Sequence, residues 1–232
     1  ADGKIVVVGS TDGAILVMRL NADGSLDTSF GTDGWSVFDV IADELDYVGD
    51  CVVRPTGEVV VICTNEGENE DGRGSVVQFT PSGALDAAFG TNGVLTINNG
   101  IPGATEQLHA IDLASSGTIH VLGTARTAIN STDDTYVYRI TPAGTLDPDF
   151  DGDGHCLVPI GTGDELPSAI AVLANGQVLL AGSTNMAGTD HPFVARLNAD
   201  GSFDTAFGDG GVHIMAGIVG RFDGAHEQCQ VV

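Results

Sequence analysis

Short apolar runs alternate with turn residues along the whole chain, and no stretch shows the spacing of an amphipathic helix. In the second quarter of the sequence this pattern predicts strands at about residues 49–54, 58–64, 75–80 and 94–98. A small polar residue followed by glycine, as in Thr56-Gly57, marks the tight turn of a hairpin. We therefore expect an all-β protein made of short antiparallel strands.

The strand pattern occurs four times. The segment LNADGSLDTSFG at residues 20–31 returns as LNADGSFDTAFG at 197–208, with looser copies at 79–90 and 140–151. Such a period indicates units that bury their apolar faces only by stacking on copies of themselves. Because all copies are needed for one core, we expect a single domain whose repeats cover about residues 1–54, 55–114, 115–173 and 174–232.

Four strands in each of four repeats predict a four-bladed β-propeller with four-stranded antiparallel blades. The last three residues, QVV, align with residues 171–173, and Ala1 aligns with Ala174. We therefore expect residues 226–232 to pair with residues 4–9, so that the N- and C-terminal strands close the ring and protect each other's edges. A monomer is favoured; the alternative is a dimer in which each chain forms half of an eight-bladed ring.

The run DGKIVVVGSTDGAILVMRLNADGSLDTSFGTDGW resembles the delta-60 repeat family, whose members are bacterial β-propeller repeats of unknown function found in secreted proteins. The resemblance covers the whole chain and is closest in the first and last repeats. Departures include Cys63 and Asp151, where the other repeats have glycine. The resemblance implies a propeller fold and a secreted or cell-surface location, and it implies no catalytic residues.

The net charge of the chain limits the classes of partner that it is expected to bind. A net charge of −24 with only eight basic residues argues against nucleic-acid binding, which needs a positive surface. No apolar run is long enough to span a bilayer, so membrane insertion is not expected. A cation, a basic peptide, a small molecule or a carbohydrate are the candidate partners.

Residues that recur in every repeat are predicted to serve the scaffold. The repeated aspartates are Asp27, Asp86, Asp147 and Asp204, and three repeats place an arginine eight residues earlier, at Arg19, Arg139 and Arg196. We expect carboxylate–guanidinium pairs across the turn.

The four cysteines lack a CxxC spacing and are predicted to be buried thiols, with Cys51 and Cys229 the one pair to consider for a disulfide. The hairpin turn predicts that Cys63 lies opposite Asp50 and Cys51 opposite Ile62.

Residues that differ between repeats are the candidates for function. The starts of the innermost strands would bring acids and histidines to the mouth of the central channel. The expected ligand-binding residues are Asp46, Asp50, Glu106, Glu165 and Glu227, and the expected metal-binding residues there are His109 and His226. Carboxylates favour calcium, whereas imidazoles would favour zinc or copper.

A second candidate metal site lies in DPDFDGDG. Asp147, Asp149 and Asp151 match the opening of an EF-hand loop. Position 12 would be Val158, which supplies no carboxylate, and flanking helices are not expected. The loop is therefore predicted either to bind calcium weakly or to be a solvated turn.

Two functions follow from these features. The first is a secreted binding or adhesion module that takes a divalent cation, another ligand, or both at the channel mouth. The alternative is a metal-dependent enzyme, a hydrolase or redox enzyme, in which the channel-mouth histidines and carboxylates hold the metal. The sequence contains no nucleophile elbow, phosphate-binding loop or HExxH motif, so it favours the binding module.

Overall fold

The structure is a computed structural model that describes residues 3–42, 44–66, 72–97, 105–126 and 132–215. All regular structure within these ranges is β, as the sequence predicts. The chain divides into two compact units, residues 1–98 and 99–232, and each is described by itself. The prediction of a single domain stays a prediction.

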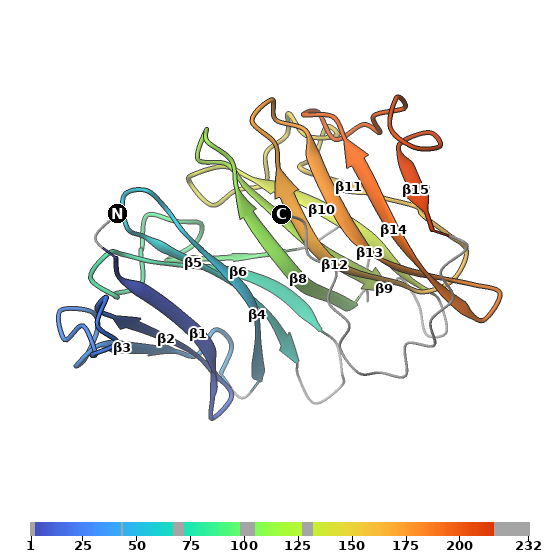
Figure 1. The fold of residues 1–232 in the computed structure, drawn as a ribbon. Helices are drawn as coiled ribbons and strands as arrows, with labels where there is room; N and C mark the ends of the chain where they lie inside the picture. The colour runs from blue at the N-terminus through green and yellow to red at the C-terminus, as the bar shows by residue number, and fades with distance from the viewer. Residues whose placement is uncertain (1–2, 43, 67–71, 98–104, 127–131, 216–232) are drawn as a thin grey trace. The chain divides into compact units, whose positions relative to one another are not determined.

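The first unit contains two antiparallel sheets, each with its strands in chain order (Figure 1). Sheet 1 consists of β1 (Ile5–Thr11), β2 (Ala14–Leu20) and β3 (Trp35–Phe38). Sheet 2 consists of β4 (Leu45–Val53), β5 (Val59–Glu66), β6 (Arg73–Phe79) and β7 (Val94–Thr96).

The second unit repeats this plan with two four-stranded antiparallel sheets. Sheet 3 consists of β8 (Thr105–Leu113), β9 (Ile119–Arg126), β10 (Asp133–Ile140) and β11 (His155–Leu157). Sheet 4 consists of β12 (Glu165–Val172), β13 (Val178–Met186), β14 (Thr189–Leu197) and β15 (Val212–Ile214).

Four up-and-down antiparallel sheets of three or four strands are consistent with propeller blades. Sheet 1 has three described strands, and its expected fourth strand, residues 226–232, lies outside the described residues. The closure of a ring by the two terminal strands therefore stays a prediction.

The first strands of sheets 2, 3 and 4, the innermost strands among the described residues, each contain a β-bulge that the sequence did not predict. The register with the neighbouring strand shifts at Gly49, His109 and Ser168, which occupy one repeat position. Two features correct the predicted pairing of the cysteines. The hairpin turn closes between Arg54 and Glu58, which places Cys51 opposite Val61, and the bulge adds a second shift that places Cys63 opposite Val48. An extra residue in one strand displaces all later partners by one.

Each unit has its own apolar core between its two sheets. Cys63 belongs to the core of the first unit, and Cys156 belongs to that of the second. Burial raises the pKa of both thiols to about 12. Among the described residues, Cys51, Cys63 and Cys156 are free, whereas Cys229 lies outside them, so the Cys51–Cys229 pair stays untested. The buried thiols therefore act as small apolar side chains.

The repeated arginine–aspartate pairs are confirmed. In each pair the arginine Nε donates to the carboxylate, and the guanidinium lies over the phenylalanine three residues after the aspartate. The pairs are Arg19–Asp27 at 2.6 Å, Arg139–Asp147 at 2.8 Å and Arg196–Asp204 at 2.7 Å. In the second repeat, Gln78 donates to Asp86 instead, at 2.7 Å.

The same arginine also joins neighbouring sheets. In the first unit, Arg19 Nη1 donates to the Pro81 carbonyl at 2.6 Å, and the Gly31 amide donates to the Ser82 carbonyl at 2.8 Å. In the second unit, Arg139 Nη1 donates to Ala199 at 2.5 Å. The repeated motif is therefore both a turn and the joint to the next sheet.

Replacing Arg139 by methionine is expected to lower the free energy of unfolding by about 1 to 2 kcal/mol. The methionine keeps part of the apolar stem but loses the bonds to Asp147 and Ala199. Urea unfolding of parent and variant measures the difference. A matched change of Arg126, whose ion pair with Asp133 is exposed, is expected to cost much less. Equal costs for the two variants would contradict the joint role.

Candidate functional site

The acids predicted at the channel mouth begin the innermost strands. Asp46, Glu106 and Glu165 occupy one repeat position at the starts of β4, β8 and β12, and we call them the strand-start acids. All three are buried, with only 1%, 5% and 1% of their surface exposed. Since buried carboxylates need hydrogen-bond donors, their partners indicate what they do.

Glu165 accepts three backbone hydrogen bonds. Its Oε1 receives the amides of Ile160 and Gly161 at 2.8 and 3.0 Å, and its Oε2 receives the amide of Thr135 at 2.9 Å. The first two donors belong to the segment that joins sheet 3 to sheet 4, and the third lies in β10. The carboxylate therefore holds this connection against both sheets.

Asp46 does the same in the first unit. Its Oδ2 accepts the amide of Val40 at 2.9 Å, and its Oδ1 accepts the Asn65 side chain at 2.5 Å. Val40 lies in the connection between sheets 1 and 2. Burial raises the pKa of Asp46, which the two hydrogen bonds partly oppose. Asp46 and Glu165 therefore clamp equivalent connections.

The other predicted channel-mouth residues have different surroundings. Asp50 is half-buried and accepts the amide of Cys51 at 2.7 Å. Glu227 and His226 lie outside the described residues. A ligand-binding role for the predicted set stays a prediction, and the described contacts of Asp46 and Glu165 add a structural role to it.

His109 is the bulge residue of β8. Its Nε2 lies 3.1 Å from the Thr124 hydroxyl on β9, and burial lowers its pKa. The equivalent bulge residue in sheet 4, Ser168, also bonds to the next strand, through the Ala181 carbonyl. The bulge therefore turns this side chain back onto the sheet, although a neutral imidazole keeps the capacity to bind a metal.

The aspartates of the EF-hand-like segment form a turn. Asp147 uses one oxygen for Arg139 and the other for the amide of Asp149, whereas Asp149 and Asp151 are exposed. Their predicted calcium binding stays a prediction.

Across the described residues, no three His, Cys, Asp or Glu side chains gather into a group that could hold a metal ion. The same part of the chain has no apolar helix of membrane-spanning length.

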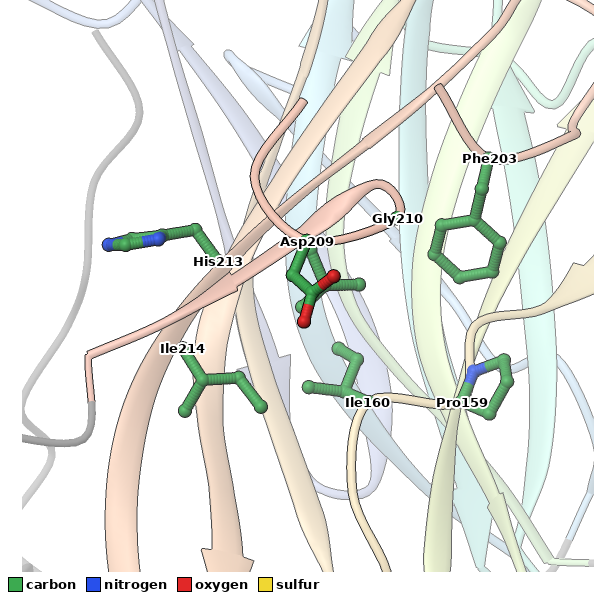
Figure 2. Close-up of a pocket in the computed structure, with 8 residues that line it drawn as sticks. Pro159, Ile160, Phe203, Asp209, Gly210, His213 and Ile214 are labelled. Atoms are coloured by element: carbon green, nitrogen blue, oxygen red, sulfur yellow. The ribbon is translucent and has the colours of Figure 1, made fainter. Parts of the chain in front are cut away.

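A pocket of about 460 Å³ lies in the second unit. Pro159 and Ile160, from the connection that Glu165 holds, form one side. Phe203, Asp209 and Ile214, from sheet 4 and its turns, are among the residues of the other side. Figure 2 shows the Asp209 carboxylate directed toward the isoleucines, whereas the His213 ring points away.

Three segments of the chain, residues 1–30, 114–150 and 173–207, match the family described as domain of unknown function (DUF5122) beta-propeller. These three segments are similar to DUF5122 beta-propeller repeats. The matched segments include the arginine, aspartate and phenylalanine of the first, third and fourth repeats. No curated protein matches the chain.

Similar solved structures include a polysaccharide lyase of family PL25, an ulvan lyase, solved alone and with bound -[GlcA(1-4)Rha3S]-. Each lyase structure is 12% identical, with a TM-score of 0.49, and the match covers 84% of this chain and 53% of the lyase. An endo-arabinase from Bacteroides thetaiotaomicron VPI-5482 is 13% identical, with a TM-score of 0.45 and coverage of 85% and 72%. The chain thus spans about half the length of the lyase, and similarity at this level does not establish its activity.

The sequence pattern did not single out Asp209. The first and second repeats place Thr32 and Thr91 at the equivalent position, so the signal was a residue that differs between repeats. Asp209 lies outside the segments that the sequence analysis considered for function, because its turn belongs to the repeated scaffold.

Proposed function

We propose that this chain is a secreted or cell-surface binding module whose ligands are cationic, namely divalent cations or basic peptides. The delta-60 resemblance supports the location. The observation that carries the proposal is that all seven basic residues within the described ranges have acidic or polar partners in the chain. They are Lys4, Arg19, Arg54, Arg73, Arg126, Arg139 and Arg196.

Even with these basic residues paired, the acidic residues of the chain far outnumber the basic residues that could neutralise them. The chain has 32 acidic residues and a net charge of −24, and the described basic side chains are held by internal contacts. Uncompensated carboxylates raise the local concentration of cations and speed the association of positively charged partners. Anionic ligands would be repelled by these carboxylates, and the described basic side chains that could bind them already have partners within the chain.

Divalent cations are expected to raise the melting temperature, because an ion that binds only the folded chain stabilises it by mass action. At about ten times the dissociation constant the gain is about 1.4 kcal/mol, or a few degrees. Differential scanning fluorimetry with calcium, magnesium and zinc, each compared with chelator at matched ionic strength, measures the effect.

Isothermal titration with a lysine-rich peptide and a glutamate-rich control tests the second ligand class. Binding of the basic peptide that weakens with salt is the expected result. A chain that bound neither a divalent cation nor the basic peptide would contradict the proposed function.

A further inference from the structure

We propose that the pocket between the 159–160 segment and sheet 4 binds an aliphatic cation of the lysine side-chain type, presented by a basic peptide. This inference rests on the proposed preference for cationic ligands and gives that preference a specific place. The argument uses the shape, lining and construction of the pocket, each within the second unit.

The lining combines apolar side chains with one carboxylate, whereas the His213 ring, on a residue that also lines the pocket, points away from it (Figure 2). Pro159, Ile160, Phe203 and Ile214 supply the apolar part, and Asp209 is the acidic residue of the lining (Figure 2). A lysine side chain has the matching form, with a long apolar stem and a terminal ammonium. Its stem would lie against the apolar side chains while the ammonium meets the Asp209 carboxylate. A volume of about 460 Å³ leaves room for such a group.

Both sides of the pocket are held in place. The Asp209 amide donates to the Val212 carbonyl at 2.7 Å, in an isolated β-bridge that fixes the turn. Opposite it, Glu165 binds the amide of Ile160 at 2.8 Å. A site whose walls are positioned before the ligand arrives loses less entropy on binding.

The acidic group is not required by the turn. The same β-bridge forms in the first and second repeats, where Thr32 and Thr91 replace the aspartate. A pocket of about 560 Å³ in the first unit contains Thr32 and Trp35 and has no charged residue in its lining. Asp209 therefore gives the pocket of the second unit a charge that the scaffold does not need.

The test uses the whole chain and a blocked glycine–lysine–glycine tripeptide. Two-dimensional NMR titration is expected to show saturable shifts at the amides of Ile160, Val212 and Ile214. A tripeptide with diaminobutyric acid keeps the charge at neutral pH but shortens the stem, and one with Nε-acetyllysine keeps the stem but removes the charge. Both are expected to bind at least about fivefold more weakly, since each loses one of the two contacts.

Two substitutions accepted elsewhere in the repeats test the pocket itself. Asp209→Thr uses the residue at positions 32 and 91, and Ile214→Thr uses the residue at position 96. Each is expected to weaken lysine-tripeptide binding about fivefold or more. Asp200→Asn changes an exposed acid outside the pocket, removes a charge from the same unit and is expected to leave the affinity unchanged.

Affinities for the lysine tripeptide that match the parent in both threonine variants would overturn this site. An equal loss of affinity in the Asp200→Asn control would also overturn it, because that result would indicate attraction by overall charge alone. If the parent bound divalent cations but not the lysine tripeptide, this inference would fail while the proposed function stood.

Discussion

Replacing Glu165 by alanine is expected to lower the free energy of unfolding by about 3 kcal/mol. The substitution leaves the amides of Thr135, Ile160 and Gly161 without their acceptor in a site where Glu165 itself is only 1% exposed. Each unsatisfied buried donor costs its own desolvation. Equilibrium urea unfolding, followed by circular dichroism, measures the change.

Glu165→Gln is the matched control, since it keeps the length of the side chain and one acceptor oxygen. It is expected to lose less stability than the alanine variant, because one side of the amide still accepts while its NH₂ group faces a former donor. An alanine variant as stable as the parent would show that the connection between sheets 3 and 4 does not depend on the carboxylate.

Acidification from pH 7 to pH 4 is expected to destabilise the parent through His120 by at most about 3 kcal/mol. His120 is only 3% exposed and lies edge-on to Phe150, with a ring distance of 6.0 Å. Burial, assisted by the Arg139 guanidinium, lowers its pKa from 6.5 to about 4. Between these values the unfolded chain takes up a proton that the folded chain does not, so stability falls as the pH falls.

His120→Leu isolates this contribution, because Leu179 occupies the equivalent position in the fourth repeat. Unfolding free energies of parent and variant, measured by urea unfolding at intervals from pH 7 to pH 4, are expected to diverge in favour of the leucine variant. The comparison cancels the titration of His109 and of the carboxylates. A constant difference across this range would mean that His120 is protonated equally in the folded and unfolded chains.

The repeat pattern predicted the parts of the fold that depend on neighbours in the chain. Turns marked by glycine, apolar alternation and the pairing of Arg139 with Asp147 all involve residues eight or fewer positions apart, or a single hairpin. The prediction that the repeated aspartates serve the scaffold was confirmed by their hydrogen bonds. The predicted register of Cys63 was wrong because the hairpin turn closes between Arg54 and Glu58, and because the extra residue at Gly49 has no local signature in the sequence.

In the candidate site, the strand-start acids show the same difference between what the sequence predicts and what only the structure reveals. The sequence predicted these acids at the entries to the innermost strands, and the strand of Asp46 begins earlier, at Leu45, than the predicted residue 49. The sequence did not predict that the three acids are buried. Asp46 and Glu165 are covered because the preceding connections fold over them and donate backbone amides. Composition shows that a carboxylate is present, whereas only packing shows how many donors surround it.

By itself, the sequence determined the all-β class, the fourfold repeat, the arginine–aspartate turns and the acidic character of the chain. These depend on residue type and short-range spacing, which the chain carries wherever it folds. The tertiary structure alone decided the bulges at Gly49, His109 and Ser168, the clamping of the connections by buried acids, and the pocket that joins Ile160 to Asp209. These features bring together residues from different strands and sheets, and their free energies depend on burial and on the direction of each donor, which spacing along the chain does not encode.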